Sequence, residues 1–555
     1  MTNEHSLNAR ARQQALEKVM LPHNLAPATV TYSTYGHLLI CGAEDQIRLA
    51  AARIRGMASI TLLVTEKIST RDESQLEAAL AAVPDLRLYR AAISSSKGFL
   101  GQFQISVEHQ GQQENLAKIA QNRVHFDLIL NLAEESLFAA ELAPAGYFNA
   151  RPDSAELQAL ISALPDYIGE FEKPRYFQIN NDICAHSSRG QTGCSRCLDV
   201  CPADAIRSID QLISIEPHLC HGAGGCATAC PTGAISYALP QPVRMHDYLQ
   251  RLIDAYLQAG GAEPVILFHD HEQGLEQLNT VRTELADNVI PVQLEELAAA
   301  GQETWLCCLA AGATRVLLLD TPALPESMRA LLQRELKVTG IMLQGLGYSA
   351  QQVSLLSSTE LLQQPALQNI PLMPQGRIEE TNKRAALFAA LDQLIDQNGI
   401  ADQDFIPLPA GSPFGQVNVD HAKCTLCLSC VAVCPTQALT AGGEKPALNF
   451  TEQSCVQCGM CESSCPEQAI NLTPRLSLLP ERSQSVEIHA EEAFECIRCS
   501  KPFAPRSTVE KMLSKLSGHR MFQGDAINRL KMCEDCRVGD IYTDLAANPE
   551  KQLEL

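Results

Sequence analysis

Short apolar runs alternate with amphipathic segments along residues 36–132, as expected of strands separated by helices. The runs GHLLICG, SITLLVTE, DLRLYRAA, FQISVEH and DLILNL have the length and β-branched content of strands. Between them, EDQIRLAAARI and ESQLEAALAA place apolar residues at helical spacing. This alternation predicts an α/β layer domain, which we assign to residues 1–175.

The same alternation returns in residues 241–406. We expect PVILFHD, NVIPVQL, RVLLLD and KVTGIML to be strands and PESMRALLQREL to be a helix. The following PLPAGSPFG, residues 407–415, has the Pro and Gly content of a linker. A second α/β domain is therefore predicted. The two α/β domains share no evident motif, so both an internal duplication and a fusion of independent modules fit the chain.

Composition and charge narrow the class of protein. The chain is 46% hydrophobic, but its apolar runs are far shorter than the roughly 20 residues that a membrane helix needs. Because the N-terminus lacks an apolar signal segment, we expect a cytoplasmic protein without membrane insertion. The net charge of −21 disfavours nucleic acid and suits docking to basic patches on redox proteins.

The 22 cysteines indicate the chemistry. In a large chain without an export signal, metal binding is favoured over disulfide formation. Most of the cysteines fall into closely spaced sets within residues 184–230, 424–465 and 496–536. The remaining three lie in apolar segments and are expected to be core residues: Cys41, Cys307 and Cys308.

The most specific motif is a doubled one, for which we predict a ferredoxin-like domain over residues 416–475. CTLCLSCVAVCP and CVQCGMCESSCP each have the C-x2-C-x2-C-x3-C-P spacing of bacterial two-cluster ferredoxins. Three cysteines of each run bind one cubane and the fourth reaches the other. One predicted [4Fe–4S] cluster takes Cys424, Cys427, Cys430 and Cys465. The other takes Cys455, Cys458, Cys461 and Cys434. We expect a strand before each loop and a helix from CPTQAL and CPEQAI.

A divergent copy of this motif predicts another ferredoxin-like domain over residues 176–240. CAHSSRGQTGCSRCLDVCP has seven extra residues between its first two cysteines, and their polar character indicates a surface loop. The endings CPADAI and CPTGAI match those of the intact copy. Crosswise ligation then assigns a third [4Fe–4S] cluster to one complete set: Cys184, Cys194, Cys197 and Cys230.

The second half of the divergent copy, CHGAGGCATACP, lacks one cysteine. Ala223 stands where the second thiolate is expected, which leaves three ligands: Cys201, Cys220 and Cys226. A [3Fe–4S] cluster needs only three thiolates and is our expectation here. Two alternatives stay open. A [4Fe–4S] cluster could use a non-cysteine ligand, such as His221 or water, or the site could be empty.

The C-terminal residues 485–545 form a further cysteine-bearing unit, for which we expect a zinc-ribbon-like fold. CIRC and CEDC supply four thiolates, from Cys496, Cys499, Cys533 and Cys536. Four thiolates suit tetrahedral Zn²⁺ in a closed structural site, and we predict zinc. An iron–sulfur cluster is the alternative.

The two cysteine blocks resemble bacterial dicluster ferredoxin domains. With GEFEKPRYF before the first block and ECIRCSKPF…MCEDC at the end, the chain resembles the 4Fe–4S proteins encoded beside molybdenum formate dehydrogenases in proteobacteria. Residues 241–400 faintly resemble the small α/β iron–sulfur subunit that relays electrons between hydrogenase and heterodisulfide reductase. The resemblance implies an electron-transfer subunit or carrier for redox protein partners, with formate dehydrogenase as the partner enzyme.

Two other functions stay open. The α/β domains could make the chain a flavin- or nucleotide-dependent oxidoreductase, although it contains neither G-x-G-x-x-G nor G-x-x-x-x-G-K-[ST]. The chain could also be a maturation factor for a molybdoenzyme. We identify no substrate site and no catalytic residue.

Overall fold

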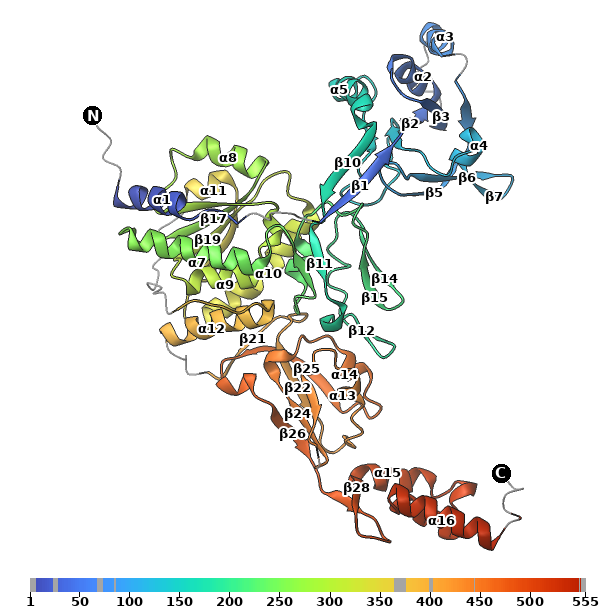
Figure 1. Cartoon of the computed structure of the whole chain (residues 1–555), viewed down its shortest axis with the longest axis vertical. Helices are drawn as coiled ribbons and strands as arrows, with labels where there is room; N and C mark the ends of the chain where they lie inside the picture. Colours follow the sequence, from blue (N-terminus) through green and yellow to red (C-terminus); the bar gives the residue numbers. More distant parts are fainter. Residues whose placement is uncertain are drawn as a thin grey trace.

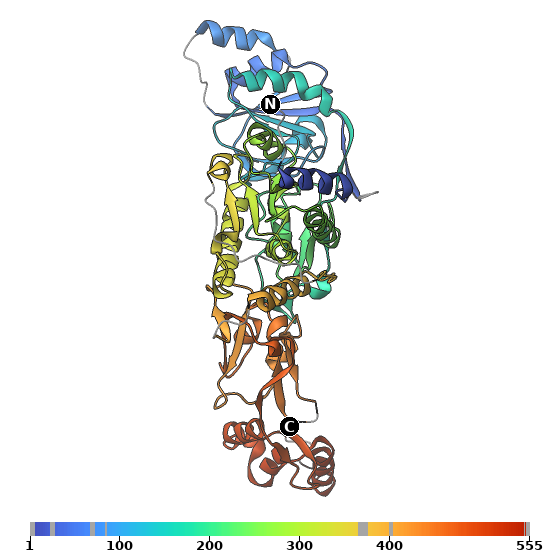
Figure 2. The ribbon, with the colours of Figure 1, turned by 90° about the vertical axis from the view of Figure 1, so that its left-hand side faces the viewer.

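The computed structural model describes residues 6–22, 28–66, 73–83, 86–363, 376–398, 403–443, 445–548 and 550. Figures 1 and 2 show an elongated molecule with an α/β layer at one end and a small helical unit at the other. A second α/β layer and two cysteine-rich modules lie between these ends. We call the modules module 1 (residues 176–240) and module 2 (residues 403–491).

The N-terminal α/β layer is built on a parallel five-stranded sheet with strand order β4-β3-β2-β8-β9. Its strands are β2 (His37–Ala43), β3 (Ser59–Glu66), β4 (Leu88–Arg90), β8 (Leu128–Asn131) and β9 (Tyr147–Asn149). Its helices are α2 (Glu44–Arg53), α3 (Glu73–Ala82), α4 (Leu116–Gln121) and α5 (Ala155–Ala163). A small antiparallel sheet joins it: β5 (Ile93–Lys97), β6 (Gln104–His109) and β7 (Gln112–Asn115). These elements follow the predicted alternation.

A two-stranded ribbon connects this layer to module 1. Strand β1 (Thr29–Thr34) pairs antiparallel with β10 (Gly169–Pro174) over its whole length. Figure 1 shows the ribbon descending from the N-terminal layer towards the centre of the molecule. Lys173, on this ribbon, donates hydrogen bonds to the carbonyls of His218 and Cys220 at 2.8 Å each, so the ribbon reaches the cysteine loop of module 1.

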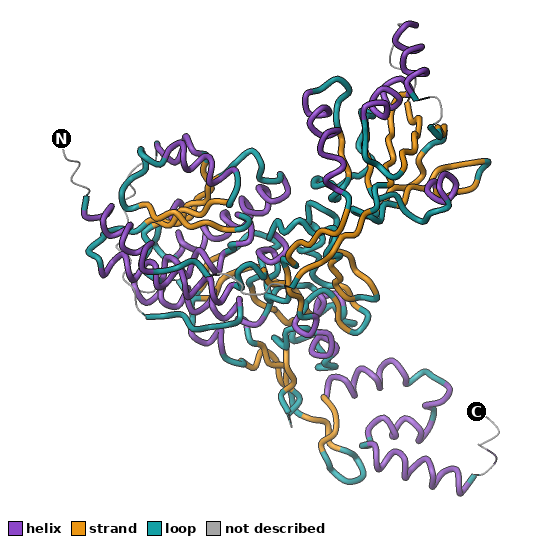
Figure 3. Tube along the Cα trace, turned by 45° about the horizontal axis from the view of Figure 1, so that its top comes forward, coloured by secondary structure: helices purple, strands orange, loops and turns teal. Residues whose placement is uncertain are grey.

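The second α/β layer has a parallel four-stranded sheet of order β18-β17-β19-β20, between helices on both faces (Figure 3). Its strands are β17 (Val265–Asp270), β18 (Val289–Leu294), β19 (Arg315–Leu319) and β20 (Val353–Leu356). One face is covered by α7 (Pro242–Gln258), α9 (Gln302–Ala310), α10 (Glu326–Gly345) and α12 (Lys383–Asn398). The other is covered by α8 (Gln273–Val281) and α11 (Ser358–Leu362). Burial on both faces explains the nearly continuous apolar strands.

The N-terminal helix α1 (Leu7–Lys18) packs on this second layer although the chain continues from it into the first. Ala11 and Ala15 are fully buried in the same core as Leu252 and Tyr256 of α7. Figure 1 places α1 beside α7, away from the N-terminal sheet.

The predicted strand KVTGIML is wrong, because residues 337–343 continue α10. The run contains β-branched residues, which favoured a strand. Within the helix, Val338 and Met342 lie about one turn apart, and both are buried against the core together with Leu343. The fourth strand of the sheet is β20 instead.

Both modules have the same strand pairing. In module 1, β11 (Phe177–Ile179) pairs with β16 (Ile235–Tyr237), and β14 (Ile206–Ile209) pairs with β15 (Leu212–Ile215). In module 2, β22 (Gly415–Val419) pairs with β25 (Ile470–Ser477), and β23 (Leu439–Ala441) pairs with β24 (Ala447–Phe450). Module 2 adds β21 (Phe405–Pro407) beside β25 and β26 (Val486–Ala490) beside β24. The insertion of module 1 is a small hairpin of β12 (Ser187–Ser188) and β13 (Gln191–Thr192).

The helix predicted after each Cys-Pro is also wrong, because the short helices come before it. They are α6 (Gly225–Ala229), α13 (Ser429–Val433) and α14 (Met460–Ser463). After each Cys-Pro the chain makes a tight turn and enters a strand. The third residue after the cysteine has a positive φ in all four copies: Asp204, Gly233, Gln437 and Gln468. A left-handed residue cannot continue a right-handed helix.

The C-terminal unit combines a hairpin with helices. Its elements are β27 (Ala493–Glu495), β28 (Pro502–Pro505), α15 (Arg506–Leu516) and α16 (Glu534–Ala547). The first cysteine pair lies in the hairpin loop and the second at the start of α16. Within the described parts of the chain, no helix has both the length and the apolar character needed to cross a membrane.

Candidate metal centres

The two predicted cysteine sets of module 2 come together as separate groups. The thiol of Cys430 lies near those of Cys424, Cys427 and Cys465, the four-cysteine group that we call site 4. The thiol of Cys461 lies near those of Cys455, Cys458 and Cys434, which we call site 3. Burial raises the pKa of Cys430 to about 12, and the neighbouring thiols contribute to the rise. These buried thiols stay protonated when free, whereas a coordinating thiol is deprotonated by its metal.

The complete set of module 1 gathers in the same way. The thiol of Cys197 lies near those of Cys184, Cys194 and Cys230, and we call this group site 2. Burial, followed by these thiols, raises the pKa of Cys197 to about 12. The inserted hairpin therefore loops out without displacing Cys184 from its partners.

The incomplete set also forms a group, which we call site 1. Cys226 lies near Cys201 and Cys220, and burial, followed by these thiols, raises its pKa well above the usual value. All three cysteines line one cavity together with Ala223 and His221.

The backbone of the incomplete loop matches those of the intact loops. Gly222 and Gly224 have positive φ on either side of Ala223. The corresponding residues of module 2 share this feature: Leu426, Leu428, Gln457 and Gly459. Ala223 thus occupies the position of a second cysteine in an otherwise unchanged loop.

Backbone amides also point at the predicted fourth thiolate of three half-motifs. Ala205 donates to Cys201 Sγ at 3.4 Å, Ile235 to Cys230 Sγ at 3.5 Å and Ala469 to Cys465 Sγ at 3.3 Å. Hydrogen bonds to cluster sulfurs stabilise negative charge and are among the factors that set reduction potentials.

The sulfur spacing distinguishes the four ferredoxin-like sites from the C-terminal one. Among the described residues, only Cys496, Cys499, Cys533 and Cys536 form a group of three or more potential ligands whose atoms all lie within 4.8 Å of one another. A single tetrahedral ion with bonds of about 2.3 Å would hold its sulfurs about 3.8 Å apart. In a cubane each thiolate binds a different iron, so the thiolates lie further apart. The geometry of the C-terminal site fits one ion, whereas no other group of described ligands has this tight spacing.

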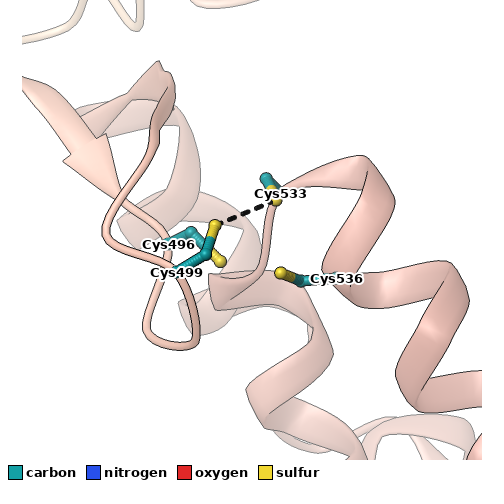
Figure 4. A group of neighbouring side chains, drawn as sticks. All are labelled: Cys496, Cys499, Cys533 and Cys536. Carbon is teal, nitrogen blue, oxygen red and sulfur yellow. Dashed lines mark hydrogen bonds between the residues drawn. The ribbon is translucent and has the colours of Figure 1, made fainter.

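Figure 4 shows the C-terminal group, in which the hairpin cysteines face those of α16. The Sγ atoms of Cys499 and Cys533 are 3.6 Å apart. Burial alone would raise the pKa of Cys496, but hydrogen bonds from the backbone of Cys533, Arg498 and Cys499 outweigh it and lower the pKa to about 6. The Cys496 thiolate is thus available to a metal ion at neutral pH.

The two modules meet where site 2 faces site 3. Cys194 and Cys458 line one cavity of about 490 Å³, and their thiols interact electrostatically. A Cβ on Gly193 would lie 2.8 Å from the Cε atom of Met460, which shows how closely the modules pack. Cys226 also lies near Cys197 and Cys230, and Cys461 lies near Cys430. Neighbouring sites are therefore adjacent in the order 1, 2, 3, 4.

Two basic side chains at the start of α12 reach both modules. Lys383 donates to the carbonyls of Ala227 and Thr228 in module 1, at 2.6 and 2.8 Å. Arg384 donates to the carbonyls of Gln453 and Cys455 in module 2, each at 2.6 Å. Neither residue was predicted from the sequence, because a Lys-Arg pair on a helix carries no signal of what it contacts.

The comparisons with known proteins concern the cysteine motifs. Residues 423–470 match the family of 4Fe-4S dicluster domains. Hydrogenase-4 component A of Escherichia coli (strain K12) is 46% identical over 64 residues, which are 12% of this chain and 29% of that protein. Ferredoxin 7Fe of Hydrogenibacillus schlegelii is 32% identical over 60 residues, 11% of this chain and 77% of that protein. The chain therefore spans less than a third of hydrogenase-4 component A.

The comparisons and the cysteine groups agree on the nature of the cofactor. They confirm the predicted [4Fe–4S] chemistry. The chain belongs to the ferredoxin-type iron–sulfur proteins.

Proposed function

We propose that this protein relays single electrons between two redox partners through sites 1–4. When bound, each iron–sulfur cluster accepts and releases one electron. The observation that carries the proposal is the contact between the modules, where Cys194 and Cys458 line one cavity. Without it the chain would hold two separate carriers, whereas with it the four sites form one continuous row.

Each metal centre that we propose is held by one group of cysteines. We propose cubane clusters at sites 2, 3 and 4, held by the cysteine sets defined above. Site 1, with Cys201, Cys220 and Cys226, takes the fourth cluster, for which three thiolates suffice if it is a [3Fe–4S] cluster. The four-cysteine group of the C-terminal unit takes Zn²⁺ and has a structural role. We also propose that the chain divides into domains at the boundaries predicted from its sequence.

The partner we propose is a cytoplasmic oxidoreductase, with the chain as its subunit or carrier. The resemblance to proteins encoded beside molybdenum formate dehydrogenases favours formate dehydrogenase. The similarity to hydrogenase-4 component A makes a hydrogenase the second candidate. The net charge of −21 favours partners with basic docking surfaces.

A break in the row tests the relay. We expect Cys458→Ala in the full chain to remove the cluster of site 3 and to slow electron transfer from donor to acceptor by at least about tenfold. Cys308→Ala is the matched control, because Cys308 is a fully buried cysteine of the second α/β core. The relay is refuted if Cys458→Ala lacks its cluster yet transfers electrons as fast as Cys308→Ala.

A deletion strain separates the relay from the maturation role. If the protein is a relay, its deletion leaves formate oxidation intact with an artificial dye as acceptor and abolishes it with the natural acceptor. If it is a maturation factor, its deletion abolishes both activities. Anaerobic co-purification with either enzyme then distinguishes formate dehydrogenase from hydrogenase as the partner.

A further inference from the structure

The cavity of site 1 contains a histidine with an unused ring nitrogen. His221 lines it beside Cys201, Cys220 and Cys226. Its Nε2 atom is buried and has no hydrogen-bond partner among the described residues. A buried polar atom without a partner costs free energy, so its position calls for a partner that the protein itself does not supply.

The other ring nitrogen determines what Nε2 can do. The ring of His221 makes a hydrogen bond to the backbone of Ala143 that favours its protonated state, so the ring donates to the carbonyl. Because Nε2 has no partner, Nδ1 carries that proton. Nε2 then carries a lone pair and no hydrogen, and it cannot donate to a cluster sulfur.

We propose that His221 Nε2 is the fourth ligand of site 1, which therefore holds a [4Fe–4S] cluster with three cysteine ligands and one histidine. The arrangement is the usual one for a metal-bound histidine, whose second ring nitrogen donates to a carbonyl that fixes the tautomer and the ring orientation. This inference rests on the proposed function, because it presumes a cluster at site 1. A [4Fe–4S] cluster at site 1 then takes the place of the [3Fe–4S] cluster that we expected from the three thiolates.

The packing around the loop holds His221 at the cavity. A Cβ on Gly222 would lie 2.7 Å from the ring of Tyr176, and one on Gly224 would lie 2.6 Å from the backbone of Ala299. The loop is thus clamped between module 1 and the second α/β layer. The loop of Ala143 is fixed as well, because the neighbouring Leu142 donates to the carbonyl of Pro202 at 2.8 Å.

Two other positions in the cavity offer no equivalent ligand. Ala223, at the place of the missing cysteine, has no donor atom. Tyr237 is the second buried polar group there without a partner among the described residues, at its hydroxyl. Burial raises its pKa well above the usual value, so the hydroxyl keeps its proton and is a hydrogen-bond donor, not a metal ligand.

Spectroscopy of the whole protein, purified without oxygen, tests the ligand. We expect the oxidised protein to lack the EPR signal of a [3Fe–4S] cluster. After reduction, pulsed EPR should detect a strongly coupled imidazole nitrogen, and the coupling should change when the chain carries ¹⁵N-histidine. In His221→Ala, we expect the nitrogen coupling to disappear, iron to fall by about one atom per chain, and a three-iron signal of about one spin per chain to appear in the oxidised state.

Two further variants complete the test. His221→Cys should keep the cubane, lose the nitrogen coupling and lower the reduction potential of site 1, because a thiolate adds negative charge. His271→Ala, just after the end of β17, should leave every signal unchanged. If His221→Ala does not fold, the nitrogen coupling of the unaltered chain still shows whether a histidine binds the cluster of site 1.

The inference is overturned if the unaltered protein shows the three-iron signal or lacks the nitrogen coupling. A failure of the proposed function looks different. The reduced signals of sites 2, 3 and 4 would then be absent, or they would be present but carry no electrons between partners.

Discussion

Arg384 places a positive charge beside site 3, and its removal should lower the reduction potential of that site. Its guanidinium donates to the carbonyls of Cys455 and Gln453, at 2.6 Å each, and to that of Pro413 at 3.1 Å. It also lies over the ring of Phe414, with 5.0 Å from the guanidinium carbon to the centroid. Burial lowers the pKa of Arg384 to about 10, so the side chain stays charged at neutral pH.

The size of the effect follows from Coulomb's law. For a separation of about 7 Å between this charge and a cluster at site 3, an effective dielectric constant of about 20 gives about 2.4 kcal/mol. For transfer of one electron this corresponds to about 100 mV. Because the reduced cluster carries the additional negative charge, losing the cation destabilises the reduced state. We therefore expect Arg384→Gln to lower the midpoint potential of site 3 by about 100 mV.

An EPR-monitored redox titration of the full chain measures this shift. Arg384→Lys keeps the charge and should retain more than half of the original stabilisation. Arg482→Gln is the matched control, because Arg482 lies over Phe388, as Arg384 does, but forms an ion pair with Asp392. If Arg384→Gln keeps an intact cluster whose potential matches that of Arg482→Gln, the charge of Arg384 does not set the potential of site 3.

Three further predictions concern the C-terminal site, the second α/β layer and site 1. Cys533→Ser should release about one zinc per chain, leave the iron content unchanged and expose α16 to proteolysis, because a structural ion contributes directly to folding; an unchanged zinc content would exclude the site. Burial, and then Asp270, raise the pKa of Glu296 to about 7, so folding favours the protonated carboxyl. The stability that this group contributes is therefore present below about pH 4 and is lost as the pH rises through 7. Glu296→Gln should therefore stabilise this layer by about 1–2 kcal/mol at pH 8, allowing for partial solvent exposure, and by much less at pH 5; calorimetry that shows the same gain at both pH values would contradict this pKa. Ala223→Cys should provide a thiolate that competes with His221, so the nitrogen coupling of site 1 should weaken or vanish in pulsed EPR; an unchanged coupling would show that the new thiol does not reach the cluster.

The spacing of residues along the chain was enough to predict those strands and cysteine groups whose geometry depends only on nearby residues. The C-x2-C-x2-C-x3-C-P runs predicted which thiols of module 2 gather, because the spacing determines how a tight loop presents its sulfurs. The strands β2, β3, β17 and β19 followed from apolar runs. The predictions that failed were also local. Residues 337–343 were expected to be a strand, and a helix was expected after each Cys-Pro, because periodicity cannot distinguish a buried helix from a strand and does not reveal a left-handed residue.

The sequence by itself determined that this is an iron–sulfur protein, and it predicted a set of cysteines for each cluster and the place where one cysteine is missing. Only the tertiary structure decided how the groups relate to one another. Cys194 and Cys458 are distant in the chain and meet because the two modules pack together. Arg384 reaches site 3 from an α/β domain, and the ring of His221 is oriented by Ala143 from another. Contacts of this kind depend on the packing of whole domains, whose surfaces carry no periodic pattern or motif that a single sequence would reveal.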